Sequence, residues 1–440
     1  MTRIRWRAPD RSTTDGRRTA GPPLWRVVHL ALLALILAAC AAPAAAVQPP
    51  VAERSVTLIL WHGWYGAPRQ ALAQIVDSYN QQHPSQRVSL QSIPLASFAA
   101  DLRGAVAAGD GPHLVLMPST WVGALAASGT ILPLDADIAP LDTQTLVPTA
   151  LGGGRAADST QQMRTFALPL TFDTLALYYN SANIAIPPAD TQSLLESARG
   201  LGDTQAKPPV WGMALDLSPD MTIGYLYAFG GRIFDEQGRV ALGTGGRDGA
   251  QQWLGWLSAL NGNERLLARV EQSAEIDRVL QDGRALMTFD WSYRLPLYRA
   301  VWGDRTGVAG LPTLSETSRP PEPYVRSDVL AVNSRVSADE RRAALDFMRF
   351  ALSQPSQQLL LEADLQPSLL SLPLEGDDAR HAAARIFRAQ ALAGRPMPNT
   401  PTRGLVDQEL TLMQRRVLLG LTDATDAIDT ADTNLKQQFP

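Results

Sequence analysis

Cysteine is almost absent from this chain of 440 residues, which has a single one at position 40. A lone cysteine allows neither an intramolecular disulfide nor a metal site built from several thiolates. Histidine is also scarce, and none of the five histidines has the His-x-x-x-His or Glu-x-x-His spacing of a metal-binding helix. We therefore predict that the protein holds no metal ion.

The motifs of nucleotide-binding and nucleophilic enzymes are missing as well. The glycine-rich stretches 152–154 and 243–246 lack the Lys-Ser/Thr of a P-loop and the strand-to-helix setting of a dinucleotide site. No Gly-x-Ser-x-Gly or Ser-x-x-Lys motif is present. A carboxylate pair for glycoside cleavage stays open, because many acidic residues are available to meet in space. We expect no cofactor and no catalysis, with a secreted glycoside hydrolase as a remote alternative.

Positive charge is concentrated at the start of the chain. Lysine and arginine number 39 against 43 acidic residues, a net charge of −4, and seven arginines fall in the first 39 residues. The rest of the chain has 32 basic and 41 acidic residues. Because this acidic body has no basic stripe to neutralise a phosphate backbone, we predict that the protein binds no nucleic acid.

The N-terminal segment has the layout of an export signal. An arginine-rich stretch precedes an apolar run over 27–39, which is interrupted only by His29 and is short for a membrane span. The run ends in Leu37-Ala38-Ala39-Cys40, which resembles the lipobox of bacterial lipoproteins. That resemblance implies a lipid on Cys40 and anchoring outside the cytoplasm, while an uncleaved anchor with an incidental cysteine is the alternative. The Ala- and Pro-rich residues 41–51 indicate a flexible tether.

The body of the chain alternates short apolar runs with segments of helical periodicity. Strands are predicted over 56–61, 88–93 and 113–117, separated by helices. This alternation favours an α/β fold with a mostly parallel sheet, whose ligands bind at the carboxyl ends of the strands. One hydrophobic core rarely exceeds roughly 250 to 300 residues, so the length indicates a second α/β lobe. Its strands are expected over 174–179, 211–215, 285–289 and 308–311, and the C-terminal end is predicted to be mainly helical.

Aromatic residues follow several of the predicted strands. Trp64 and Tyr65 come just after the first strand, Trp121 follows the third, and Trp291 and Tyr293 follow the strand over 285–289. In an open α/β sheet these positions border the ligand crevice. Aromatic faces there stack on the C–H face of a sugar ring or on a cation, whereas the alternative is that these rings fill the core.

Several segments together resemble the extracellular solute-binding proteins of ABC importers, in particular the group that includes maltodextrin-binding and other sugar-binding proteins. Besides the lipobox, these segments are, in chain order, Leu58-Ile59-Leu60-Trp61-His62, 124–134, 168–170, 177–180, 228–234, 282–287 and Met397-Pro398-Asn399-Thr400-Pro401. The resemblance extends over nearly the whole mature chain. It implies a monomer that binds a carbohydrate, performs no catalysis, and delivers its solute to membrane permease subunits.

The resemblance also implies the fold and its division. Two lobes of the periplasmic-binding-protein fold would be joined by hinge crossings near 178–180 and 311–312, with a ligand cleft between the lobes. The implied division is 1–39 signal peptide, 40–54 lipidated cysteine and tether, 55–180 first lobe with 323–350 returning to it, and 181–312 second lobe with the C-terminal helices of 351–440.

The cleft contacts of sugar-binding members carry over to a defined set of positions. These are Trp64, Tyr65, Thr120, Trp121, Asp173, Asp220, Trp291 and Tyr293, with Asp290 and Arg326 as polar additions. The tryptophans would stack on sugar rings, and Asp173 and Asp220 would accept hydrogen bonds from hydroxyl groups.

One part of the pattern departs from the maltodextrin binders. Asp407 and Gln408 stand where those proteins carry aromatic rings, which leaves a smaller sugar, another oligosaccharide or a polyol open. A polyamine or a phosphodiester is the non-sugar alternative. The charge of the cleft would distinguish them, since an anion needs arginine side chains that point inward.

Overall fold

The computed structural model describes residues 55–138, 143–235, 239–269 and 273–439. The predicted signal peptide, Cys40 and the tether over 40–54 lie outside this part of the chain. Within the described ranges, no helix is both long and apolar enough to cross a lipid bilayer.

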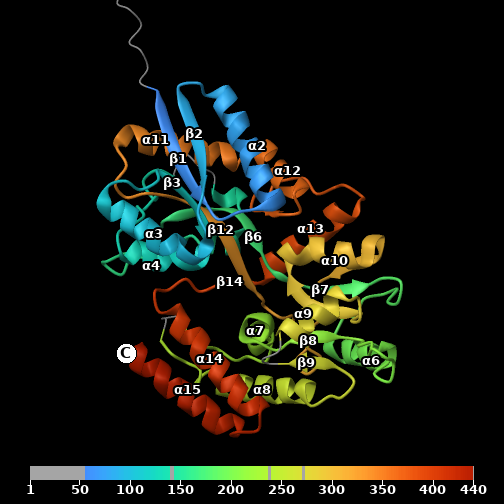
Figure 1. Cartoon of the computed structure of the whole chain (residues 1–440). Helices are drawn as coiled ribbons and strands as arrows, with labels where there is room; N and C mark the ends of the chain where they lie inside the picture. Colours follow the sequence, from blue (N-terminus) through green and yellow to red (C-terminus); the bar gives the residue numbers. More distant parts are fainter. Residues whose placement is uncertain (1–54, 139–142, 236–238, 270–272, 440) are drawn as a thin grey trace, which may run out of the picture. The chain divides into compact units, whose positions relative to one another are not determined.

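A seven-stranded mixed sheet forms the centre of the first α/β region (Figure 1). β1 (Val56–His62) is parallel to both β2 (Gln86–Ser92) and β3 (Leu114–Pro118), as the alternation of strands and helices predicts. β12 (Tyr324–Val332) is antiparallel to β3 and β6 (Ala167–Asp173). The chain enters β12 from a separate, smaller sheet, and not by a helical crossover from β3 or β6 as in a parallel pair. The predicted parallel order therefore applies to one side of the sheet only. In spatial order the strands are β13 (Gln366–Pro367), β6 (Ala167–Asp173), β12 (Tyr324–Val332), β3 (Leu114–Pro118), β1 (Val56–His62) and β2 (Gln86–Ser92), with β14 (Arg395–Pro396) paired to β12.

Helices cover both faces of this sheet (Figure 1). Successive side chains of a strand point to opposite faces, so Leu58 and Leu60 of β1 enter one core while Val115 and Met117 of β3 enter the other. On the Leu58 face lie α2 (Gly66–Gln82), α11 (Ala338–Ala351) and α12 (Gln354–Glu362), and on the opposite face lie α3 (Leu95–Ala108) and α4 (Val122–Ala127).

A second α/β region is built around a three-stranded antiparallel sheet. Its sheet contains β10 (Met287–Trp291), β7 (Leu175–Asn180) and β11 (Thr306–Ala309), and β8 (Ala214–Asp216) pairs in parallel with β9 (Leu267–Arg269). The helices here are α6 (Thr191–Leu201), α7 (Pro219–Ala228), α8 (Arg247–Asn261), α9 (Ser273–Gln281), α10 (Leu295–Trp302), α14 (Arg403–Leu418) and α15 (Ala424–Gln438). Three small elements are α5 (Pro148–Gly152), β4 (Arg155–Ala157) and β5 (Met163–Thr165), and a further long helix is α13 (Ala379–Ala393). At the centre of the second core, the fully buried Trp253 donates a hydrogen bond of 3.1 Å from its indole Nε1 to the Thr222 carbonyl.

The chain passes from the large sheet to the small one at Thr174, between β6 and β7. This position precedes the crossing expected at 178–180, where Tyr178 is instead buried and donates a hydrogen bond of 3.0 Å to the Trp291 carbonyl. The return runs between β11 and β12. The segment 351–440, expected in the second lobe, is divided between the cores: α12 packs with the first sheet, whereas α14 and α15 pack on α8.

Candidate functional site

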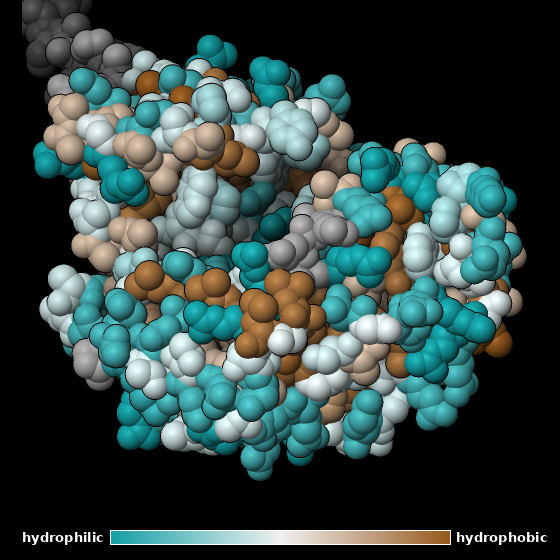
Figure 2. Space-filling model, turned by 60° about the horizontal axis from the view of Figure 1, so that its bottom comes forward, coloured by the Kyte–Doolittle hydropathy of each residue, from teal (hydrophilic) through white to brown (hydrophobic). Residues whose placement is uncertain are grey.

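A cavity of about 950 Å³ opens where the carboxyl ends of β1, β3 and β6 face α7 and the start of α14. The surface in Figure 2 is hollowed, with apolar side chains along the rim of the hollow. Both α/β regions contribute to the cavity wall, since Trp121 comes from the first, and Asp220 and Arg403 come from the second. The cavity therefore has the location that the fold favours for a ligand.

Strand direction explains why distant segments meet at this edge. Trp64 follows β1 and Trp121 follows β3, while Asp173 is the last residue of β6. Because β12 runs the opposite way, its early residues Arg326 and Asp328 reach the same edge. A register shift between Asp328 and Val329 interrupts the ladder to β6, and such irregularities re-aim side chains beside functional sites.

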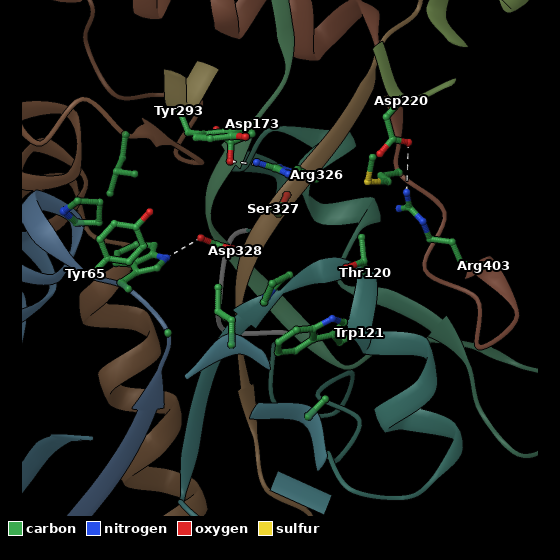
Figure 3. Close-up of a pocket in the computed structure, with 18 of the residues that line it drawn as sticks. Tyr65, Thr120, Trp121, Asp173, Asp220, Tyr293, Arg326, Ser327, Asp328 and Arg403 are labelled. Atoms are coloured by element: carbon green, nitrogen blue, oxygen red, sulfur yellow. Dashed lines mark hydrogen bonds and ion pairs between the residues drawn. The ribbon is translucent and has the colours of Figure 1, made fainter. Parts of the chain in front are cut away.

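Eight of the ten predicted ligand residues line the cavity. They are Trp64, Tyr65, Thr120, Trp121, Asp173, Asp220, Tyr293 and Arg326. Tyr65 is 82% exposed and Tyr293 is 46% exposed, so both rings remain available to a ligand. In Figure 3 Asp220 and Arg403 lie at one side of the cavity, Tyr65 lies at the other, and Arg326 and Asp328 lie between them.

The structure does not place Asp290 and Trp291 on the cavity wall, in contrast to the sequence-based expectation. β10 continues to Trp291 instead of ending at 289, so both side chains are held within the sheet, only 8% and 6% exposed. The Asp290 carboxylate accepts hydrogen bonds from the Tyr298 hydroxyl at 2.5 Å and from Arg294 Nε at 3.1 Å. Burial raises the pKa of Asp290, while these partners oppose the rise. Asp290 is therefore a structural residue of the second α/β region.

Asp290→Ala is expected to destabilise the protein by about 1 to 3 kcal/mol, because it leaves the buried Tyr298 hydroxyl without its acceptor. Urea denaturation of the variant and the wild type measures this difference. Unchanged stability combined with lost ligand binding would instead return Asp290 to the binding site.

Arg326 is held between two aromatic rings and a carboxylate. Its Cζ lies 4.6 Å from the centre of the Trp291 ring and 4.7 Å from that of Tyr293. Its Nε lies 3.6 Å from Asp173 Oδ2, and the Ser292 hydroxyl donates a hydrogen bond of 2.8 Å to the other oxygen of Asp173. Burial is the largest single effect and lowers the pKa of Arg326, but Asp173, Tyr293 and Asp328 together outweigh it, so the pKa is raised. Arg326 is thus a fixed, charged floor of the cavity.

Asp328 is the carboxylate beside this floor. Trp64 donates from its indole Nε1 to Asp328 Oδ2 at 2.6 Å, which also fixes the orientation of the Trp64 ring. Burial, and next the nearby negative charge of Asp173, raise the pKa of Asp328 to about 6, against the opposing effects of Trp64 and Arg326. Asp328 therefore keeps acceptor capacity that a ligand hydroxyl group can use.

The far side of the cavity is closed by a second ion-pair network. Arg403 Nε lies 2.7 Å from Asp407 Oδ2, and Arg403 Nη2 lies 3.5 Å from Asp220 Oδ1. Burial raises the pKa of Asp220, and the Arg403 guanidinium is the largest effect that opposes the rise. Asp407 is therefore a wall residue held by Arg403.

Sequence reasoning missed Asp328 and Arg403 as cavity residues. Asp328 opens the apolar run 328–332, and such a run predicts a strand but no binding residue. One signal in the sequence could have identified Asp328: it is a charged residue at the start of an otherwise apolar strand. Such a side chain must face a partner, water or a ligand. Arg403 offered no such signal, because it lies at the start of a helix.

The cavity combines aromatic faces with an excess of negative charge. Its wall carries five aspartates against three arginines, namely Asp173, Asp220, Asp328, Asp364 and Asp407 against Arg103, Arg326 and Arg403. Carboxylates accept hydrogen bonds from hydroxyl or ammonium groups, and aromatic rings stack on apolar ring faces. In the described part of the chain, no group of three or more His, Cys, Asp or Glu residues is arranged to hold a metal ion.

Two α/β regions, joined by strand crossings and sharing a cavity, define the fold of a two-lobed solute-binding protein. The maltose/maltodextrin-binding domain from Bdellovibrio bacteriovorus bound to maltotriose is similar, with a TM-score of 0.68 and 24% identity over 87% of this chain and 100% of that one. The cyclic alpha-maltosyl-1,6-maltose binding protein from Arthrobacter globiformis has a TM-score of 0.73 and 20% identity over 86% of this chain and 97% of that one.

Sequence comparison agrees with the fold. Residues 74–381 match the family of the bacterial extracellular solute-binding protein, and the chain belongs to this family. The maltotriose-binding protein of Pyrococcus abyssi is 23% identical over 354 residues, which are 79% of this chain and 74% of that protein. The two-lobed α/β fold expected from the sequence is thereby confirmed.

Proposed function

We propose that this protein is the substrate-binding component of an ABC importer, and that it binds an oligosaccharide in the cavity and delivers it to permease subunits. The observation that carries the proposal is the meeting of Trp64, Trp121 and Tyr293 with acidic side chains in one cavity. A pyranose ring presents both partners that this wall accepts, an apolar C–H face and a rim of hydroxyl groups.

The size of the cavity favours an oligosaccharide over a single sugar ring. At about 950 Å³ it stands near the top of the roughly 300 to 1,000 Å³ range of small-molecule sites. Similar proteins carry names that refer to maltotriose, maltodextrin and related glucans, so these sugars are the first candidates. Asp407 offers hydrogen bonding where maltodextrin binders carry a ring, so other oligosaccharides and polyols stay in the comparison.

The charge of the cavity weighs on the non-sugar alternatives. Arg326 and Arg403 are each paired with an aspartate, so a phosphodiester would meet an acidic wall with two of the three arginines already engaged. A polyamine fits the excess of carboxylates. It is therefore the main alternative to a sugar, and the binding experiment must include both.

Thermal unfolding of the purified protein with oligosaccharides, polyols, polyamines and phosphodiesters tests the proposal. A ligand that binds only the native state raises the free energy of unfolding, and with it the melting temperature. The gain is about 2.7 kcal/mol when the free ligand concentration is a hundred times Kd. We expect a shift with a saccharide that is lost in Trp121→Ala and Asp173→Ala. A shift with polyamines alone would overturn the sugar assignment and leave the family membership intact.

We further propose that a lipid on Cys40 anchors the protein, as a monomer, at the outer face of the cell membrane. The support is the sequence Leu37-Ala38-Ala39-Cys40 after an apolar run, together with membership of an extracellular family. Cys40→Ser is expected to stop incorporation of labelled fatty acid and the membrane anchoring that depends on it. Continued labelling of the serine variant would contradict this proposal.

A further inference from the structure

A second cavity of about 400 Å³ adjoins the first, and nothing in the proposed function uses it. It is bordered by the end of α7, the start of β12, strand β14 and the first turns of α14. Its volume alone falls within the roughly 300 to 1,000 Å³ range of small-molecule sites. It is therefore large enough to hold part of a ligand.

The two cavities share wall residues. Arg403 and Asp407 border both of them, and they are joined by the 2.7 Å contact between Arg403 Nε and Asp407 Oδ2. The partition is thus a pair of polar side chains whose hydrogen-bonding groups suit hydroxyl groups on both sides. A tightly packed apolar wall would not offer a polyhydroxylated chain any such contact.

The second cavity also has the two kinds of surface found in the first. The Tyr227 ring lies under Arg395, whose Cζ is 4.5 Å from the ring centre, and Arg395 Nε is held 2.5 Å from Glu322 Oε2. The Tyr227 and Tyr324 hydroxyl groups lie 3.2 Å apart. One of them must donate to the other, so one phenolic proton is left over for a further acceptor. Aromatic carbon and hydroxyl donors therefore line this space as well.

We propose that the second cavity is an extension of the binding site, which takes the outer residues of an oligosaccharide too long for the main cavity. The inference rests on the proposed function, because it assumes that a saccharide occupies the main cavity. The saccharide chain would pass along Arg403 and Asp407, and its end would reach Tyr227 and Arg395. The preferred ligand is then a longer oligosaccharide and not a disaccharide.

Calorimetric titration of the full chain against saccharides of increasing length tests this inference. The probes are linear maltodextrins from maltose to maltoheptaose, with cello- and xylo-oligosaccharides of matching lengths. Arg232→Trp narrows the second cavity from an exposed position, and Val406→Phe narrows it from a buried one. Arg265→Trp is the matched control, because it makes the same change at an exposed arginine that borders neither cavity.

In the wild type and in Arg265→Trp, we expect affinity to rise by about tenfold or more once the saccharide outgrows the main cavity. Arg232→Trp is expected to remove that gain while it leaves the affinity for the shortest binding saccharide unchanged. Val406→Phe is expected to remove the same gain in affinity. Agreement between the two variants would show that the effect does not depend on the exposed side chain at position 232.

Two results would count against the inference in different ways. If short saccharides bind but length brings no gain, or the gain survives in both narrowed variants, the extension is wrong and the proposed function stands. If the wild type binds no saccharide of any length, the proposed function fails and the extension fails with it.

Discussion

Asp328→Asn is expected to stabilise the fold at neutral pH and, in the same molecule, to weaken saccharide binding. The ionised carboxylate lies in the cavity floor near Asp173, without the close cation that Asp173 has in Arg326. An asparagine keeps the acceptor for the Trp64 indole and removes the buried charge. Stability and binding should therefore change in opposite directions.

The pH dependence of stability gives this prediction its sign. The folded pKa of Asp328 is about 6, above the unfolded value of about 3.9, so the folded state holds the proton more tightly. The resulting stabilisation is fully present below the unfolded pKa and is lost as the pH rises through 6. Asparagine removes this loss, which corresponds to a gain on the order of 2 to 3 kcal/mol at about pH 7.5 and almost none below about pH 3.

Urea denaturation of both proteins across this pH range measures the effect. The difference between the variant and the wild type isolates Asp328, because other carboxyls with raised pKa values, such as Asp216 and Asp220, are present in both proteins. The saccharide affinity of the variant should fall by roughly tenfold to a hundredfold at neutral pH. This is the loss expected when one hydrogen bond to a charged group is removed. A pH-independent difference in stability, or unchanged affinity, would contradict this role.

Arg326→Ala is expected to have the largest destabilising effect among substitutions in the cavity wall. It removes the cation between Asp173 and the rings of Trp291 and Tyr293. Breaking a buried ion pair from one side costs about 3 to 5 kcal/mol and an exposed pair contributes about 0 to 1 kcal/mol, so for the partly exposed Arg326 we expect about 2 kcal/mol. Saccharide binding should be lost as well, since Tyr293 loses the group that holds its ring.

Two further variants separate the causes of this effect. Arg326→Lys keeps the positive charge but removes the planar guanidinium group. It should therefore retain part of the stability but hold the rings of Trp291 and Tyr293 in place much less well. The double variant Arg326→Ala with Asp173→Ala should be more stable than Arg326→Ala alone, because it no longer leaves an unpaired carboxylate. Equal stability of the double and single variants would show that the ion pair contributes nothing.

The sequence was sufficient for β1, β2, β3 and the helices between them, because their pattern is local. Val56 to Trp61 is a short run of strand formers, and the helices beside it repeat apolar residues every three to four positions. The strand ends bring Trp64 and Trp121 to one edge of the sheet, as the rule for open α/β sheets predicts, whereas Asp173 was expected only from the family resemblance.

The remaining features depend on pairing between distant segments. The antiparallel direction of β12 follows from where the chain returns, which no local pattern records, and it brings Arg326 and Asp328 to the cavity. β10 ends two residues later than the apolar run over 285–289 predicts, and in a strand this shift is enough to move Asp290 and Trp291 from the cavity wall into the sheet.

Calorimetric titration with maltotriose and other short oligosaccharides, in the wild type, Trp121→Phe and Trp121→Ala, tests the central claim most directly. The ring of Trp121 borders the cavity and packs on Phe98, with the ring centres 5.6 Å apart. We predict saturable binding of a saccharide at one site, largely kept by phenylalanine and weakened by about tenfold or more by alanine. Binding of a polyamine and of no saccharide, or saccharide affinity that is the same in all three proteins, would contradict a sugar site in this cavity.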